Sequence, residues 1–483
     1  MSIARTAATG GEGMLPELLA WSSSYALDRA LVREDLLGSA AHVTMLSSVG
    51  LVPREHAASI KRELVAMYEL AREGTLVLPA DEEDIHMAVE AELWKRIGAV
   101  AGYVHTARSR NDQVALDSRL FIREEARRAQ TLCGALVMAL ADRAHAERDL
   151  LMPAYTHRQR AQPISAAFLL CAWAASIARA GRLFASTLEH ADELPLGAGA
   201  SSGTSLPIDR ALVAKLLGFA RVSLNALDTV SQRDAALDFT WAASRTLLAM
   251  GRASADLVDF SSQEFGFVEL SGRISAGSSM MPQKKNPDVF ELLRGKSARG
   301  ISNVVHLLTL MKGLPTGYFR DLQEDRQTVL ETGPLVCGAI SMFTSALPHV
   351  TFRGDRMHAA VSDGFTQATD LTEWLVKHGV PFREAYKAVG AVVADCVGRG
   401  VALSAIDVPT LQKFHARFDA SALGALDAAG AVNAKISAGS TGPAAVEAQI
   451  VTLREEARAL GRSTVPSLDD LMRGISIAHA GAA

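Results

Sequence analysis

The chain has 483 residues, of which 49% are hydrophobic and 21% are charged, and its formal net charge is −4. This balance is typical of a folded globular protein, and the length allows roughly two to four domains. No basic stripe and no apolar run of the ~18 residues that a membrane helix needs are present, so we expect neither a nucleic-acid nor a membrane partner. Four widely separated cysteines predict no disulfide framework and no zinc site, and they favour a cytoplasmic location.

The first half of the chain predicts two helices after an irregular start. The first twenty residues contain several glycines and no continuous apolar core, which predicts a frayed tail and not a signal peptide. The stretch between Pro53 and Pro79 has room for one helix. From Asn111 to Met152 the chain is rich in Ala, Leu, Arg and Glu, which predicts a long helix capped by Asn111 or Asp112.

Three further helices are expected in the middle of the chain. Pro163 favours the first turn of a helix that ends near Leu194. A stretch from Asp234 carries an apolar stripe at three- and four-residue steps, formed by Leu237, Trp241, Leu248, Ala255 and Val258. A helix between Pro287 and Pro315 would be about 40 Å long.

Helices of this length bury their apolar stripes only by packing side by side, which indicates an all-α fold with a long central helix bundle. Few segments alternate with period two, so little sheet is expected. We place an N-terminal helical domain at residues 1–107, the central bundle and oligomerisation domain at 108–359, and a C-terminal helical domain at 360–483.

Two polar segments next to predicted helices carry candidate chemistry. The run HTARSRNDQ, residues 105–113, places two arginines with hydroxyl and amide groups at a helix start, where anions bind readily. A capped, solvated helix start explains it equally well. The run YTHRQRAQP, residues 155–163, contains His157, the side-chain type best suited to move protons near neutral pH. A structural histidine is the alternative there.

The run GSSMMPQKKNP, residues 277–287, is the most informative segment. Its glycine and two prolines forbid a regular helix, so two serines, two lysines and an amide must lie on a loop. Asn286 could cap a helix that begins at Pro287, with Asp288 and Glu291 opposing its dipole. That interpretation leaves the paired serines and paired lysines unexplained.

Glycines at 197, 199 and 203 resemble a nucleotide-binding loop, but their spacing is one residue too long and no strand precedes them. A tight turn between bundle helices is the better interpretation of Gly197, Gly199 and Gly203.

The GSSMMPQKKNP run resembles the signature loop of the aspartase/fumarase superfamily of lyases. Within it, the chain is similar to the argininosuccinate lyases in HTARSRNDQ, in THRQRAQP, in GLPTGYFRDLQED (residues 313–325) and in EDIHMAVE (residues 83–90). The similarity extends from about residue 22 to 455. It implies a three-domain all-α subunit, a homotetramer whose active sites each draw on three subunits, and cleavage of argininosuccinate into arginine and fumarate without a cofactor or metal.

The resemblance also implies roles for individual residues. Ser278 matches the base that removes the proton, Lys284 its counter-charge, Asn286 a donor to the intermediate, and His157 a histidine paired with Glu291. Ser279 is the competing candidate for the base. The matched substrate contacts are Ser24, Asp28, Ser109, Arg110, Asn111, Thr156, Tyr318, Gln323 and Arg326.

The chain departs from the family pattern at a few places. Arg326 stands where the family usually has lysine, and a planar guanidinium is not equivalent to a compact ammonium. Ser201 and Ser202 replace the expected Ala-Leu, and the tail after Ser463 is longer and has no assigned place. Two alternatives are another lyase of the superfamily, such as the adenylosuccinate lyase type, and a structural protein of the crystallin type. Competent residues at every matched catalytic position argue against the second.

Overall fold

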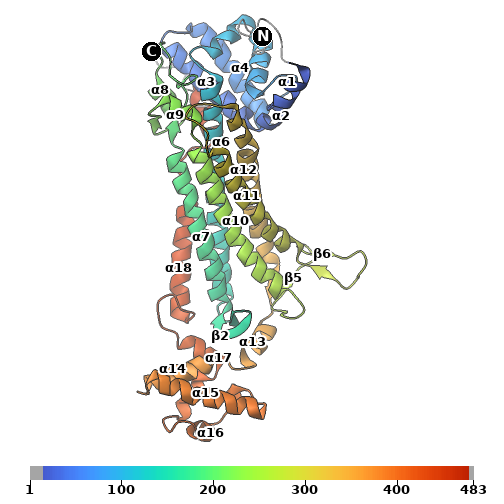
Figure 1. The fold of residues 1–483 in the computed structure, drawn as a ribbon, viewed down its shortest axis with the longest axis vertical. Helices are drawn as coiled ribbons and strands as arrows, with labels where there is room; N and C mark the ends of the chain where they lie inside the picture. The colour runs from blue at the N-terminus through green and yellow to red at the C-terminus, as the bar shows by residue number, and fades with distance from the viewer. Residues whose placement is uncertain (1–14, 478–483) are drawn as a thin grey trace.

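A computed structural model describes residues 15–477 and shows an elongated, mainly helical molecule with a long bundle between two smaller helical ends (Figure 1). The all-α prediction is confirmed. The expected N-terminal tail is wrong in part, because residues 16–22 form a helix; residues 1–14 lie outside the described part of the chain.

The bundle consists of long helices packed side by side around one core, and the last of them comes from near the end of the sequence. These helices are α6 (Arg110–Ala146), α7 (Ala166–His190), α10 (Asp234–Phe260), α11 (Asp288–Met311), α12 (Asp325–Ala346) and α18 (Pro443–Leu460). Small residues permit close approach: a Cβ added to Gly134 of α6 would lie 2.7 Å from the carbonyl oxygen of Ala457 on α18.

Two of these helices, in the ranges Ala166–His190 and Arg320–His349, are long and apolar enough to span a membrane by length and composition alone. Buried residues of both belong to the core of the bundle. Packing against neighbouring helices therefore accounts for their hydropathy.

One end of the bundle carries the N-terminal helices and the other a separate C-terminal group. The N-terminal helices are α1 (Pro16–Ser22), α2 (Tyr25–Asp28), α3 (Val32–Ser48), α4 (Arg54–Arg72) and α5 (Ile85–Ile97), with α8 (Arg210–Leu216) and α9 (Ala226–Ser231) beside them. The C-terminal group comprises α13 (Gly354–Ser362), α14 (Ala368–Lys377), α15 (Phe382–Arg399), α16 (Val408–Gln412) and α17 (Ala428–Asn433).

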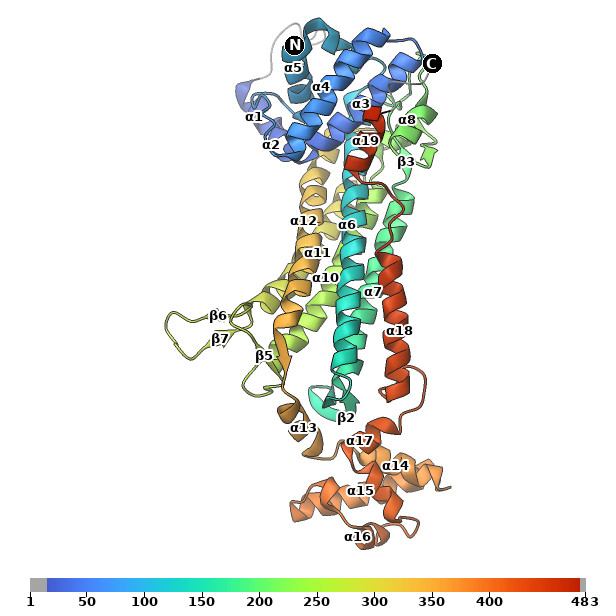
Figure 2. The same cartoon turned by 180° about the vertical axis from the view of Figure 1, so that it is seen from behind.

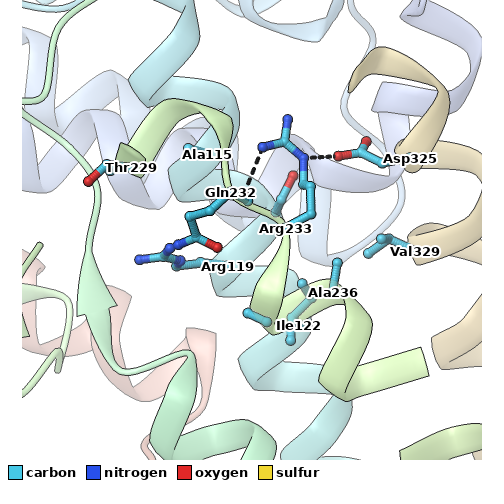
Figure 3. Close-up of a pocket in the computed structure, with 11 residues that line it drawn as sticks. Ala115, Arg119, Ile122, Thr229, Gln232, Arg233, Ala236, Asp325 and Val329 are labelled. Carbon is cyan, nitrogen blue, oxygen red and sulfur yellow. Dashed lines mark hydrogen bonds and ion pairs between the residues drawn. The ribbon is translucent and has the colours of Figure 1, made fainter. Parts of the chain in front are cut away.

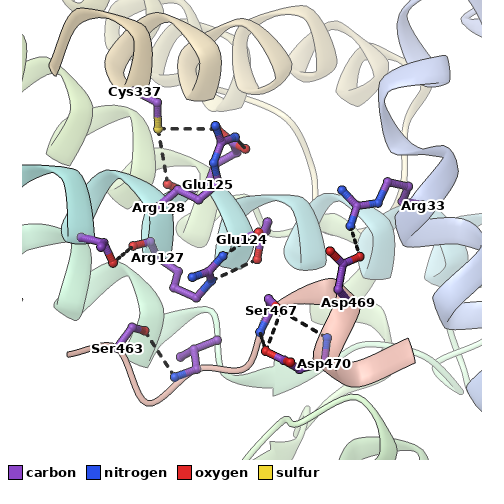
Figure 4. A network of polar contacts seen from close by, with 12 residues as sticks. Arg33, Glu124, Glu125, Arg127, Arg128, Cys337, Ser463, Ser467, Asp469 and Asp470 are labelled. Atoms are coloured by element: carbon purple, nitrogen blue, oxygen red, sulfur yellow. Dashed lines mark hydrogen bonds and ion pairs between the residues drawn. The ribbon is translucent and has the colours of Figure 1, made fainter. Parts of the chain in front are cut away.

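The segment after Ser463 runs back to the N-terminal end and places α19 (Leu468–Ile477) against α3 (Figure 2). Leu468, Met472 and Ile475 of α19 are buried there. The Asp469 carboxylate accepts a hydrogen bond from the Arg33 guanidinium at 2.6 Å (Figure 4). It also accepts one from the Tyr68 hydroxyl at 2.8 Å. This segment therefore attaches α19 to the N-terminal helices α3 and α4.

Sheet is confined to four short two-stranded pairings among the described residues: antiparallel β1 (Leu151–Thr156) with β2 (Gln159–Ser165), parallel β3 (Glu193–Leu194) with β4 (Arg221–Val222), antiparallel β5 (Val268–Leu270) with β8 (Val350–Phe352), and antiparallel β6 (Ala276–Gly277) with β7 (Lys285–Asn286).

Three local predictions are wrong. Pro163 lies in β2, where it pairs with Pro153, and the following helix begins at Ala166. The cap of α6 is Ser109, not Asn111 or Asp112. Asn286 lies in β7, and no side chain caps the start of α11. In the first two cases a side-chain cap one to three residues away, Ser165 for α7 and Ser109 for α6, satisfies the backbone groups.

Candidate active site

The start of α6 is fixed by a reciprocal cap and by a glycine turn. The Ser109 hydroxyl accepts from the Asn111 amide at 3.3 Å, and the Ser109 amide donates to the Asp112 carboxylate at 3.0 Å. The second oxygen of Asp112 accepts from the amides of Gly197 and Gly199 at 2.9 and 2.8 Å. Both glycines have positive φ, so the predicted tight turn is confirmed.

Arg110, a predicted substrate contact, forms an ion pair with Asp84, the residue that caps α5. His86, two residues further on, is fully buried and lies 2.8 Å from the Asp117 carboxylate. The segment EDIHMAVE indicated family resemblance only, so the sequence analysis assigned no role to these residues. One sequence feature could have pointed to them: Asp84 is a residue type that often caps helices, and it stands two residues before His86.

Burial lowers the pKa of the His86 imidazole, but contacts with Asp117 and Asp84 outweigh this effect and raise the pKa to about 9. Asp35, His86 and Asp117 have ligand-type atoms within 4.8 Å of one another. The Arg108 guanidinium lies among the same carboxylates and donates to the Ser39 hydroxyl at 2.8 Å. Cations of the chain thus balance these buried acids.

Because the pKa of His86 lies above its unfolded value of about 6.5, the charged imidazole stabilises the fold fully below that pH. This contribution is lost as the pH rises through about 9. We expect the free energy of unfolding to fall more steeply between pH 7 and 9 in the parent chain than in His86→Asn. Urea unfolding of both proteins across this range measures the difference, and parallel curves would contradict the assignment.

A second predicted group lies between α2 and the start of α12. The Ser24 hydroxyl donates to the Asp28 carboxylate at 2.5 Å, and Asp28 forms a fully buried ion pair with Arg326. The Gln323 amide donates to the Ser22 carbonyl at 3.1 Å, and Tyr318 is half-buried nearby in the chain. Arg326, a predicted substrate contact, is therefore paired with Asp28, which is another predicted substrate contact.

Asp325, the neighbour of Arg326, pairs with Arg233 at the start of α10 (Figure 3). Both side chains are buried, and they border a narrow cavity of about 20 Å³ between α6, α10 and α12. The two successive residues of α12 thus join α10 to the N-terminal helix α2. No local sequence pattern indicates this pair, because 92 residues separate its two members.

At the other end of the bundle, Thr156 is the last residue of β1 and His157 lies on the turn between β1 and β2. Both side chains are exposed, and His157 and Arg158 have φ values of 52° and 59°. Arg158 forms an ion pair with Asp259 at 3.0 Å. A turn with two left-handed non-glycine residues is a strained conformation of the kind found at functional sites.

Ser278 and Lys284 lie on the loop between β6 and β7, which projects sideways from the bundle (Figures 1 and 2). The prediction of a loop is confirmed. The Ser278 oxygen accepts hydrogen bonds from the amides of Met280 and Met281 at 3.3 and 3.1 Å. Lys284 is exposed, Asn286 is half-buried in β7, and Glu291 lies in the first turn of α11, where it contacts Arg294 at 3.9 Å.

One copy of the chain does not bring the predicted site residues together. They form separate groups at the N-terminal end, at the β1–β2 turn and on the β6–β7 loop. Within residues 15–477, no hydrogen bond or ion pair links His157 with Glu291.

The comparisons with known proteins agree with this fold. Residues 16–301 match a family model described as "Lyase", and residues 365–433 match one described as "Argininosuccinate lyase C-terminal". A solved EDDS lyase in complex with formate is 26% identical, with a TM-score of 0.82 over 97% of this chain and 96% of that chain. A class II fumarase from Schistosoma mansoni, 16% identical, shares the fold with a TM-score of 0.70 over 81% of this chain and 90% of its own.

The matched models define a lyase, and its fold is mainly helical. Among curated proteins, the argininosuccinate lyase of Moorella thermoacetica is 42% identical over 90% of this chain and 93% of its own length. That of Anoxybacillus flavithermus is 42% identical over 87% and 92%. The chain belongs to the argininosuccinate lyase family.

Proposed function

We propose that this chain cleaves argininosuccinate into arginine and fumarate by β-elimination, in arginine biosynthesis and without a cofactor. The observation that carries the proposal is the Ser278 oxygen, which accepts two backbone amides at the base of an exposed loop. Amides aimed at a hydroxyl oxygen favour its ionised form, because they donate to negative charge. The names of the relatives support the choice of substrate.

The reaction removes a weakly acidic proton beside a carboxylate, and the intermediate carries extra negative charge on that carboxylate. Ser278 acts as the base in its alkoxide form, which needs a cation and donors nearby. Lys284 provides the cation, and Asn286 donates to the charged intermediate. Gly277, Pro282 and the exposed position of the loop suit a lid that excludes water before the alkoxide forms.

The remaining predicted residues orient the substrate and assist the leaving group. Ser109, Arg110 and Asn111 hold carboxylates at the start of α6. Thr156 donates to substrate, while His157 with Glu291 supplies positive charge near the departing guanidino nitrogen. The contacts to the arginine half come from Ser24, Asp28, Tyr318, Gln323 and Arg326.

This mechanism requires several copies of the chain, because the three groups are far apart in one copy. We assign a homotetramer with shared active sites. Exposed apolar side chains on the bundle support it, since covering them in an oligomer is favourable; they are Trp241, Leu248, Leu292, Ile301, Val305 and Leu308. Trp241 and Leu248 of the predicted stripe of α10 belong to this outer face, whereas Leu237 and Val258 of the same stripe are half-buried against the core. We place the enzyme in the cytoplasm.

The direct test supplies the purified protein with argininosuccinate and measures both products. Fumarate is followed by its absorbance, and arginine by chromatography. Equal amounts of the two are expected. Cleavage of adenylosuccinate but not argininosuccinate would assign the chain to the other lyase type, and no cleavage of either would support the crystallin-type alternative.

Replacement of Lys284 by alanine is expected to lower kcat by about 10²–10³-fold, because one charge-stabilising donor is lost from the site. Lys285→Ala is the matched control, since this neighbouring lysine is equally exposed and has no assigned contact with substrate. We expect the control to retain activity within a few-fold. Equal losses of kcat in the two variants would contradict the assignment of Lys284 as the cation that stabilises the intermediate.

A further inference from the structure

A cavity of about 580 Å³ lies on the N-terminal end, beside the predicted carboxylate-binding Arg110. We call it the Trp94 pocket, and it is lined by Glu82, Met87, Glu90, Ala91, Trp94, His105 and Arg110. Trp94 is 52% exposed although it borders this concave surface. None of the roles assigned above uses Met87, Ala91 or Trp94, so the apolar wall of the pocket has no function in the mechanism as described.

The loop between β6 and β7, whose residues 278–284 we call the loop tip, exposes two apolar side chains. Met280 is 86% exposed and Met281 is 40% exposed. Two neighbouring exposed methionines are costly to leave in water, and thioether sulfur packs favourably against aromatic rings. The β6–β7 loop and helix α5, which contains Trp94, lie far apart in one copy of the chain (Figure 2).

The charges of the two surfaces are opposite. Arg110 and His105 also line the pocket, but Arg110 pairs with Asp84 and His105 lies 3.7 Å from Glu90. Residues 81–84 form an unbroken acidic segment at its edge, so its surroundings stay acidic overall. Lys284 and Lys285 close the loop, and both are exposed without an ion pair among residues 15–477. Complementary charge of this kind guides association and fixes orientation.

The proposed chemistry sets a limit on where the tip can lie. Ser278 must approach within about 3 Å of the proton that it removes, next to the carboxylate held at Arg110. Met280 is two residues away, at most about 7 Å along the chain. The tip therefore reaches the surroundings of Arg110 whenever the loop is in place for reaction.

We propose that the Trp94 pocket receives the loop tip of a second copy of this chain, with Met280 packed against Trp94. This inference rests on the proposed function, because it requires the shared active site. The contact holds the lid closed while Ser278 acts, and it makes Trp94 a positioning residue.

The test introduces Met280→Cys together with Trp94→Cys, and oxidises the assembled protein in the presence of fumarate and arginine. Cysteines native to the chain are buried, so background cross-linking is low. The control pair is Met280→Cys with Val77→Cys, because Val77 is 80% exposed elsewhere on the N-terminal end. At least tenfold more disulfide-linked dimer is expected from the first pair. Equal yields, or no dimer, would overturn the inference.

A double-mutant cycle gives an independent readout. Met280→Ala and Trp94→Ala are each expected to lower kcat by about two- to tenfold, with the substrate KM little changed. The kcat of the double variant should equal that of the less active single variant, because both residues belong to one contact and losing either removes it. Fully additive losses would overturn the pairing.

The oligomeric state of the parent chain separates the two possible failures. A monomer that cleaves argininosuccinate would overturn both the shared site and the docking of the loop. An active oligomer that gives equal cross-linking in the two cysteine pairs would overturn the docking alone.

Discussion

Replacement of Ser278 by alanine is expected to lower kcat by about 10²–10⁴-fold, the contribution that a positioned general base makes. The change removes one oxygen from an exposed loop, so the fold and the assembly should persist. The two amides that point at this oxygen would then have no anion to stabilise. Steady-state turnover of argininosuccinate, with circular dichroism as the check on folding, measures the effect.

Ser279→Ala is the matched control, since Ser279 is the adjacent hydroxyl and was the competing candidate from sequence. It accepts no hydrogen bond comparable to the pair at Ser278 among the described residues. We expect its kcat to stay within a few-fold of the parent value. The opposite ranking of the two variants would transfer the role of base to Ser279.

Replacement of Arg233 by methionine is expected to destabilise the fold by about 3–5 kcal/mol, because it leaves the Asp325 carboxylate buried without its partner. Both side chains are more than nine-tenths buried in the parent chain. Methionine retains most of the length of the arginine stem, so the loss of charge dominates. Urea unfolding at a fixed protein concentration measures the change.

Arg299→Met provides the comparison, because Arg299 pairs with Glu331 on an exposed face of α11 and α12. An exposed ion pair contributes little, so the expected loss of stability is much smaller than in Arg233→Met. Similar losses in the two variants would mean that burial does not control the strength of the Arg233 pair.

Features set by local chemistry could be predicted from sequence. Pro282, Pro287 and Gly277 forbade a helix, and the segment is a loop closed by β6 and β7. The helix from Asp234 was also predicted correctly, since its stripe has helical spacing. Pro163 was misplaced because the φ angle of proline suits a helix start and an extended strand equally well.

Contacts between distant parts of the chain could not be predicted in this way. His86 contacts Asp117, and Arg233 forms an ion pair with Asp325, 92 residues away in the sequence. No local sequence pattern indicates either contact. The apolar stripe of α10 indicated a buried face but not whether its own chain covers it, and Trp241 proves to be exposed. The three-domain boundaries and the roles of the site residues stay predictions.

The central claim is that one active site combines the loop of one copy with the N-terminal end of another. Co-expression of two differently tagged variants, Ser278→Ala and Arg110→Met, tests it most directly. Each variant alone should be almost inactive, whereas purified mixed oligomers should regain turnover, because some sites then carry neither change. Mixed oligomers as inactive as either parent variant would show that Ser278 and Arg110 act within a single copy.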